Sequence, residues 1–357
     1  MKKIFTILSV IILAVVLIAC DSRPRLKVFM PTEYISEDLL DKLHKNSEYK
    51  VDIITFDSNE DMLSKYATGS YDLIIPSDYA LEELVAKGAV QKIDWTRLTT
   101  FNKSNIDSEL MGAFTQLENA ETPFTLLDYG VPYFWGSIGI LYDTTKINQT
   151  LIETEGWDIL NSGRDLMMYN SARDAVMIAL KQIYADREDT TSSVNTPTNT
   201  DLALAETWLT NIKGPKTLIA TDEVFDLMLK PTQVDLAISY SGDAVYLMDE
   251  NENLEYFVPN TGSNIFIDAI VITKDTKNLD FAYDFINFLL EEDNAYLNSV
   301  DTAYTSPRSD VINEIIEKGV YPESSYRVSF RENDEIFRYN QTLNTELINI
   351  WQRVLAN

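Results

Sequence analysis

The chain has 357 residues, 45% of them hydrophobic and 24% charged, which is enough for two globular domains of ordinary size. Its formal net charge of −27 disfavours nucleic acid and anionic substrates as partners and attracts cations to the surface. With one cysteine the chain has no internal disulfide, and with one histidine it has no His-rich metal site. His44 lies in a polar run that predicts an exposed helix end, which argues against Ser-His-Asp and Cys-His catalysis.

The N-terminus has the features of a secretory signal. Lys2 and Lys3 precede an apolar run at residues 4–19, and small residues lead into Cys20. This arrangement resembles the lipobox of bacterial lipoproteins, so we expect a signal peptide at 1–19, lipidation of Cys20 and a lipid-anchored linker at 20–25. The alternative is that residues 1–19 form an uncleaved anchor helix. Both interpretations place the rest of the chain at the outer face of the cytoplasmic membrane or in the periplasm. No later apolar run is long enough to span a bilayer.

The first part of the mature chain predicts strands that alternate with short helices. Ser36 and Ser58 are expected to cap helices, as are Ser77 and Asp78, while Gly69 and Gly88 are natural helix stops. This alternation favours a largely parallel α/β sheet. The expected strands are residues 26–30, 51–56 and 71–76, and residues 95–130 are expected to be less regular.

The second part repeats this architecture without a sequence repeat. The apolar runs at 131–142 and 265–273 are too long for strands of one small domain, and we interpret them as crossings between two lobes. Residues 186–200 predict a surface loop. Strands are expected at 166–168, 218–220 and 235–240, and helices at 172–183, 201–212, from 242, 279–291, 309–318 and 341–355.

These elements predict an α/β protein with two lobes and a hinged cleft. Lobe 1 is expected to contain residues 26–133 and 267–313, and lobe 2 residues 134–266 and 314–357. Ligands of open α/β sheets bind beyond the carboxyl ends of the strands, so residues that follow strands are the site candidates. Asp268 is the strongest candidate, because it interrupts an apolar strand and an unpaired buried carboxylate is costly.

Several motifs together resemble the substrate-binding components of ATP-driven spermidine/putrescine importers. The resemblance extends from about residue 26 to about 310 and is specific only as a set. The motifs are Thr-Glu-Tyr at 32–34, Phe-Asp-Ser-Asn-Glu at 56–60, Tyr-Asp-Leu-Ile-Ile-Pro-Ser-Asp-Tyr at 71–79, Val-Pro-Tyr-Phe-Trp-Gly at 131–136, Ser-Ala-Arg-Asp at 171–174, Ser-Tyr-Ser-Gly-Asp-Ala at 239–244 and Asn-Ile-Phe-Ile-Asp at 264–268.

The resemblance implies a type II periplasmic-binding-protein-like fold that clamps an extended polyamine between its lobes. Carboxylates hold the ammonium groups and aromatic rings pack the methylene chain. It further implies a monomer that delivers its ligand to an ABC transporter permease, with no cofactor, metal or enzymatic activity. The ligand-binding residues implied at matching positions are Thr32, Tyr34, Ser77, Tyr79, Asp174, Tyr240, Asp243, Phe266, Asp268 and Tyr304.

The chain departs from the family pattern at four positions. Pro31 stands where many members have Trp, Ser171 where a carboxylate is frequent, and Tyr240 and Phe266 where Trp is frequent. The aromatic cage is therefore reduced and one ammonium anchor is absent, which leaves the choice of polyamine open. Residues 331–339 are not assigned to either the cleft or the surface.

Each candidate also has a structural interpretation. Ser77 can be an ordinary helix cap, Asp243 a first-turn acid and Asp174 a surface residue, and the tyrosines can be core packing. Trp135 and Trp157 are expected to pack in the core.

Other functions remain open. One is a binding protein for a different small cation, an amino acid or a metal ion. Iron-binding relatives use adjacent tyrosines, and Tyr-Tyr does not occur here. Another is an acidic surface lipoprotein that contacts other proteins. An enzyme is disfavoured because no set of nucleophile and base is found.

Overall fold

The structure is a computed structural model that describes residues 23–120, 122–221 and 223–356. Its strands are β1 (Arg25–Pro31), β2 (Lys50–Phe56), β3 (Leu73–Ile74), β4 (Gly130–Asp143), β5 (Leu166–Tyr169), β6 (Thr217–Ala220), β7 (Leu236–Tyr240), β8 (Leu254–Phe257) and β9 (Ile265–Ile272). They form one sheet in the order β2-β1-β3-β9-β4-β7-β5-β6, and β8 pairs with β4.

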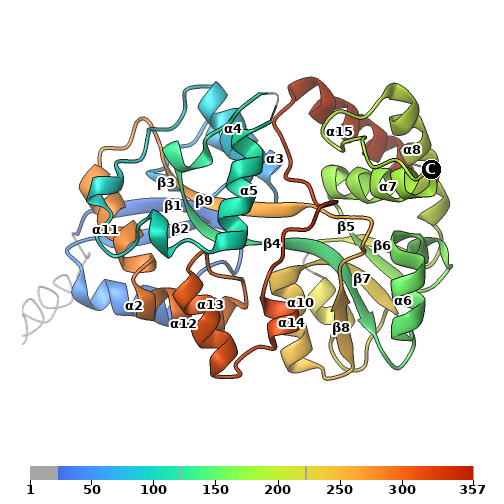
Figure 1. The fold of residues 1–357 in the computed structure, drawn as a ribbon. Coiled ribbons are helices and arrows are strands. Elements are labelled where there is room, and N and C mark those ends of the chain that lie inside the picture. The colour runs from blue at the N-terminus through green and yellow to red at the C-terminus, as the bar shows by residue number, and fades with distance from the viewer. Residues whose placement is uncertain (1–22, 121, 222, 357) are drawn as a thin grey trace, which may run out of the picture.

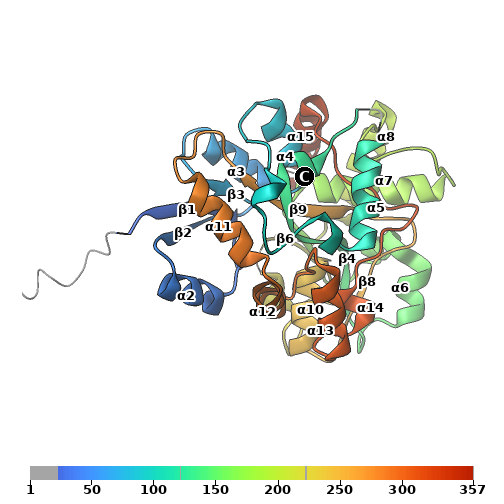
Figure 2. The same ribbon diagram turned by 60° about the vertical axis from the view of Figure 1, so that its left-hand side comes forward.

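Helices cover this sheet on both of its sides. In Figure 1, β4 and β9 run between two groups of elements. The helices are α2 (Glu37–Asn46), α3 (Asn59–Tyr66), α4 (Asp78–Ala86), α5 (Ser108–Glu118), α6 (Gln149–Glu155), α7 (Ala172–Asp186), α8 (Asn199–Ile212), α9 (Val224–Met228), α10 (Ser241–Glu250), α11 (Leu279–Leu289), α12 (Glu292–Thr302), α13 (Ser309–Glu317), α14 (Glu323–Tyr326) and α15 (Gln341–Ala356). Helices α4 and α11 pack against β9, and α7 packs against β5. Both views show α10, α12, α13 and α14 gathered at one edge of the molecule (Figure 2).

Strand β4 connects the two parts of the sheet. All 14 of its residues are buried, as expected for a strand covered on both faces. Residues 130–137 pair with β9, whereas residues 138–142 pair with β7 and residues 140–143 with β8. The β4–β9 register shifts between Pro132 and Phe134, where proline cannot donate a ladder hydrogen bond. The apolar runs that predicted crossings are thus β4 and β9.

The expected sheet was only partly right. Strands β1, β2 and β3 are parallel, and β5 is parallel to β6 and β7. Strand β9, however, is antiparallel to β3 and β4, and β4 is antiparallel to β7 and β8. The strand expected at 71–76 has two residues, the irregular region at 95–130 contains α5, and α12 was not expected.

The predicted helix N-caps at Ser36 and Ser58 are confirmed. The Ser36 and Ser58 side chains accept hydrogen bonds from the backbone N–H groups of Leu39 and Asp61. The expected exposure of His44 is wrong, because this residue is half-buried and its Nε2 accepts a hydrogen bond from Val51 N–H at 3.1 Å.

Trp135 and Trp157 are both fully buried, as expected, with 1% and 0% of their surfaces exposed. Each indole N–H donates to a backbone carbonyl, that of Ser306 for Trp135 and that of Gly262 for Trp157. Burial of these large rings with their single donor satisfied is the usual arrangement of a core tryptophan.

The segment between α14 and α15 is tied to both parts of the molecule. Arg338 donates to both carboxylate oxygens of Glu82 on α4. Lys181 of α7, which is 6% exposed, forms an ion pair with Glu335 at 2.7 Å. The segment at 331–339, unassigned from the sequence, therefore holds α4 and α7 at fixed positions on the two sides.

The expected signal peptide at 1–19, Cys20 and the start of the linker lie outside the described residues. Within the described ranges, no helix is both long and apolar enough to cross a bilayer.

Candidate ligand-binding site

The candidate residues come together where strands end and helices begin. Tyr34 follows β1, Ser77 lies between β3 and α4, and Tyr240 ends β7 just before α10. Asp268 lies in the middle of β9 and forms an isolated bridge with Ser77. The carboxyl ends of α/β strands are the expected place for a ligand.

Asp268 is buried and hydrogen-bonded by two hydroxyl groups. The Ser77 hydroxyl donates to one carboxylate oxygen at 2.6 Å, and the Tyr34 hydroxyl donates to the other. Burial raises the pKa of Asp268 from 3.8 to about 6, although the two hydrogen bonds favour the ionised form. Two hydroxyl groups of the protein thus compensate part of the cost of burying this carboxylate.

The same contact corrects the interpretation of Ser77 as a helix cap. Its side chain makes no capping hydrogen bond to α4. The hydroxyl instead accepts from the Asn59 amide at 2.9 Å and donates to Asp268. A residue type that ordinarily caps a helix here fixes the orientation of a buried carboxylate.

Asp243 is the second carboxylate of the cluster. It lies in the first turn of α10 and accepts hydrogen bonds from the hydroxyls of Tyr169 and Tyr304, both at 2.7 Å. The negative charge of Asp243 interacts favourably with the positive N-terminal end of α10, as its interpretation as a first-turn acid predicts. In addition, two tyrosine hydroxyl groups donate to the same carboxylate. Tyr169 ends β5 and was not among the predicted residues, although its place after a strand was a usable signal.

Asp174 is the third carboxylate, and its interpretation as a surface residue is wrong because only 5% of it is exposed. The Tyr240 hydroxyl donates to it at 2.8 Å. Burial raises the pKa of Asp174, while hydrogen bonds from Ser171 and Tyr240 oppose that rise. Each of the three carboxylates therefore has at least one tyrosine hydroxyl as a donor.

A continuous series of aromatic rings connects these carboxylates. Tyr304 lies 4.7 Å from Tyr34 and 6.3 Å from Phe266, measured between ring centroids. Phe266 is in turn 5.5 Å from Tyr240, and Phe134 of β4 lies 5.1 Å from Tyr34. Phe134 was missed among the candidates because its apolar neighbours predict packing alone. The rings form an apolar wall beside the acidic groups.

Tyr79 and Thr32 have different surroundings from the rest. The Tyr79 hydroxyl donates to Glu60 at 3.1 Å, and its ring meets Phe337 edge-on with centroids 6.1 Å apart. Phe337 belongs to the segment that the sequence left unassigned. Thr32 is exposed, so the structure does not bring it into the buried cluster.

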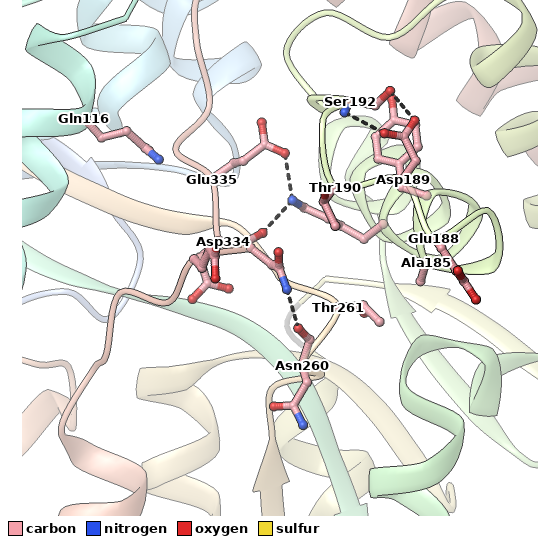
Figure 3. Close-up of a pocket in the computed structure, with 14 residues that line it drawn as sticks. Gln116, Ala185, Glu188, Asp189, Thr190, Ser192, Asn260, Thr261, Asp334 and Glu335 are labelled. Atoms are coloured by element: carbon pink, nitrogen blue, oxygen red, sulfur yellow. Dashed lines mark hydrogen bonds and ion pairs between the residues drawn. The ribbon is translucent and has the colours of Figure 1, made fainter.

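An open cavity of about 350 Å³ lies elsewhere, beside the C-terminal end of α7 (Figure 3). Lys181 is fixed there by Asn333 and Glu335, and Asp189 is held by Ser192 of its own loop. Ion pairs and loop contacts account for the side chains that line this cavity, whereas within the described residues no Lys or Arg side chain forms an ion pair with Asp268. We therefore place the candidate site at the cluster. Among the described residues, no group of three or more His, Cys, Asp or Glu side chains is arranged to hold a metal ion.

Two α/β halves that share long crossing strands, with acidic and aromatic side chains at the strand ends, define a solute-binding protein. The model of the family described as bacterial extracellular solute-binding protein matches residues 38–320, and the chain belongs to this family. Its members bind solutes outside the cytoplasm and are not enzymes, so the absence of catalysis expected from the sequence is confirmed by family membership.

Named relatives and a solved structure narrow the comparison. The spermidine/putrescine-binding periplasmic protein of Salmonella typhimurium is 28% identical over 304 residues, 82% of each chain. The putrescine-binding periplasmic protein PotF of Escherichia coli is 25% identical over 328 residues, 85% of this chain and 84% of the relative. The spermidine/putrescine ABC transporter substrate-binding protein PotD of Streptococcus pneumoniae superimposes with a TM-score of 0.73 at 25% identity, over 93% of this chain and 99% of that chain. The expected periplasmic-binding-protein fold is confirmed.

Proposed function

We propose that the protein captures a polyamine, such as putrescine or spermidine, and delivers it to the permease of an ABC transporter. The observation that carries the proposal is the buried carboxylate of Asp268, which hydroxyls orient and which no Lys or Arg side chain pairs with in the described part of the chain. The names of the relatives support the same ligand class.

The chemistry of the cluster suits an alkyl ammonium ligand. An ammonium group has three donors and no acceptor, so it needs carboxylate and hydroxyl oxygens. A tyrosine hydroxyl that donates to Asp268 or Asp243 still has lone pairs that accept from the ligand. Each charge-assisted hydrogen bond contributes about 1.5–3 kcal/mol. Two such contacts and aromatic packing of the methylene chain, less the cost of ordering, reach micromolar affinity, about −8.2 kcal/mol.

We further propose that the ligand lies between two lobes, with residues 26–133 and 267–313 in lobe 1 and 134–266 and 314–357 in lobe 2. Tyr304 supports this arrangement because its ring packs on Tyr34 while its hydroxyl reaches Asp243. It therefore contacts both sides of the proposed cleft. The ten residues predicted from the sequence remain proposed ligand contacts, with the exposed Thr32 the least supported.

The proposed state in the cell is a monomer anchored by lipid at Cys20 after removal of residues 1–19. The basic start, the apolar run and the single cysteine at the cut support it. Replacement of Cys20 by Ala should move the protein from the membrane fraction to the soluble or precursor fraction, as judged by fractionation and radiolabelled lipid incorporation. Equal membrane association and labelling of the variant would contradict the lipid anchor.

Isothermal titration of the purified protein with putrescine and spermidine tests the polyamine proposal. We expect saturable one-to-one binding, weakened at least tenfold in Asp268→Asn because a charge-assisted contact is lost. Asp143→Asn is the matched control. Asp143 is also buried and also accepts from two hydroxyl groups, those of Thr145 and Thr232, but it lies at the far end of β4. If the folded protein shows no binding of either polyamine, the proposal is refuted, and another small cation or an amino acid becomes the favoured ligand.

A further inference from the structure

The Asn59 side chain and Ser77 form a reciprocal pair of hydrogen bonds. Asn59 is the first residue of α3, and Ser77 lies in the turn between β3 and α4. The Ser77 backbone N–H donates to Asn59 Oδ1 at 3.0 Å, and Asn59 Nδ2 donates to Ser77 Oγ at 2.9 Å. A backbone N–H can only donate, so it must meet the amide oxygen, and the amide NH2 group then faces the hydroxyl. The backbone thus fixes the orientation of the Asn59 amide.

This orientation determines where the Ser77 hydroxyl hydrogen points. A serine hydroxyl has one hydrogen to donate and two lone pairs that accept. Because the Asn59 amide donates to Ser77 Oγ, the hydroxyl cannot give its own hydrogen to that amide group. The hydrogen goes instead to Asp268 Oδ1, which lies 2.6 Å from Ser77 Oγ. Asn59 therefore acts on Asp268 through the hydroxyl of Ser77.

The backbone on both sides of Asp268 is held against the same turn. The N–H groups of the residues before and after Asp268 donate to the carboxylate of Asp78 at 2.9 Å and to the carbonyl of Pro76 at 3.1 Å. Asp268 and Ser77 form the β-bridge that lies between these two contacts. Backbone pairing therefore sets the separation of the hydroxyl and the carboxylate, and the direction of the hydroxyl hydrogen remains for Asn59 to fix.

A purely structural role at the start of α3 is the rival interpretation of Asn59. Ser58 already caps this helix, because its side chain accepts from the backbone N–H of Asp61 at 3.1 Å. Both side-chain hydrogen bonds that the structure shows for Asn59 are made with Ser77 and not within α3. The amide is thus not needed for the cap, and its contacts are directed to the proposed ligand site.

Building on the proposed function, we propose that Asn59 is a positioning residue of the ligand site, which directs the hydroxyl hydrogen of Ser77 to Asp268. The Tyr34 hydroxyl donates to the other carboxylate oxygen, so each oxygen of Asp268 accepts one hydrogen bond before a ligand arrives. The remaining lone pairs are left for the N–H donors of a ligand ammonium group. A carboxylate that is already oriented binds its ligand at a smaller entropic cost.

Tyr34, Tyr304 and Asp78 are titratable groups that face Asp268. Burial raises the pKa of both tyrosines well above 10, so they stay neutral below about pH 8. Burial also raises the pKa of Asp78 to about 8, although two backbone N–H groups donate to its carboxylate. All three groups, and Asp268 itself, are retained in every variant that is compared below.

NMR of the labelled aspartate carboxyl carbons in the ligand-free protein measures the titration of Asp268, whose signal is assigned by its loss in Asp268→Asn. We expect a midpoint at about pH 6. Asn59→Asp still accepts from the Ser77 N–H but replaces the amide donor by a second acceptor, so two carboxylates compete for the hydroxyl hydrogen. The midpoint should rise by about one pH unit, because a hydrogen bond to the ionised form of Asp268 is weakened. Putrescine affinity at about pH 6 should fall about fivefold as the ionised fraction of Asp268 falls.

The Ser77→Ala background separates this contact from the added charge. Without the hydroxyl, Asn59→Asp acts on Asp268 only through space, so its effect on the midpoint should be no more than about half as large. The neutral variant Asn59→Ala should raise the midpoint when Ser77 is present and leave it unchanged in the Ser77→Ala background. Asn148→Asp is the matched control, because Asn148 caps α6 by accepting from the Leu151 N–H at 3.2 Å, outside the cluster. This variant adds the same charge at a helix start and should change neither the midpoint nor the affinity.

The outcomes separate this inference from the proposed function. An unchanged midpoint in the folded Asn59→Asp or Asn59→Ala variant overturns the inference, and so do equal shifts with and without the Ser77 hydroxyl. Unaltered putrescine affinity in a variant with a raised midpoint also overturns it. If the unmodified protein binds neither putrescine nor spermidine, the proposed function is contradicted, while the ligand-free midpoints still decide whether Asn59 acts on Asp268.

Discussion

Replacement of Asp268 by Asn should strengthen the fold while it weakens ligand binding. Burial raises the pKa of Asp268 from 3.8 to about 6, and a difference of about two in pKa corresponds to about 3 kcal/mol. Because the folded-state pKa is raised, this contribution to stability is fully present below pH 3.8 and is lost as the pH rises through about 6. The Asn side chain stays neutral and can still pair with the hydroxyls of Tyr34 and Ser77.

The quantity to measure is the difference in unfolding free energy between the variant and the unmodified protein. It should grow in favour of the variant by about 2 kcal/mol between pH 4 and pH 8, measured by urea unfolding without ligand. The pKa of the buried Asp78 is raised to about 8, mainly by burial, which is common to both proteins. The charge of Asp268 is a lesser cause of that rise, and its loss in the variant changes the difference in the same direction. A difference that stays constant over this pH range would refute the reasoning that the Asp268 charge is desolvated in the folded state.

Three further predictions concern binding. Ligand affinity should fall by up to tenfold per pH unit below about pH 6, because the cation binds the ionised form of Asp268. Titration in buffers of different ionisation enthalpy should reveal that ligand binding releases a proton. Constant affinity from pH 4.5 to 8 would contradict this prediction. Tyr304→Phe keeps the ring but removes the hydroxyl group that donates to Asp243, so calorimetry on the folded variant should show affinity reduced about fivefold. Unaltered affinity would remove Tyr304 from the site. Gly242→Ala would place a Cβ 2.5 Å from the Tyr304 ring, so we expect a stability loss of about 1–3 kcal/mol and weaker binding. Gly112→Ala, where a Cβ would meet nothing within 4 Å, is the control and should not destabilise the protein. Equal melting temperatures of the two variants would disprove the close contact.

The features that could be predicted from the sequence are local ones. The caps at Ser36 and Ser58 depend on contacts between residues three positions apart, and the long central strands β4 and β9 were visible as long apolar runs. Helix α12 escaped detection because its buried face contains Asn294, Asn298 and Ser299 instead of an apolar stripe. Polar groups that are buried through tertiary hydrogen bonds leave no periodic hydrophobic signal.

The site itself was only partly predictable. Asp268 could be recognised because a carboxylate interrupts an apolar strand, but its partner Ser77 is 191 positions away and has a strong local signal as a helix cap. Tyr79, Arg173 and Phe337 come from three separate segments, and their side chains lie against one another. Sequence patterns report what neighbours along the chain require, whereas these contacts are decided by the packing of distant segments.

The pairing of β4 with β9 also determines the order in which the chain can fold. The first eight residues of β4 pair with residues 265–271, more than a hundred positions later. Contacts of such long sequence separation form slowly, since loop closure costs entropy before any contact stabilises the chain. A chain still being secreted cannot complete the strand that joins its two halves. The topology thus delays collapse until the segment containing β9 has emerged, which suits a protein that must cross a membrane before it folds.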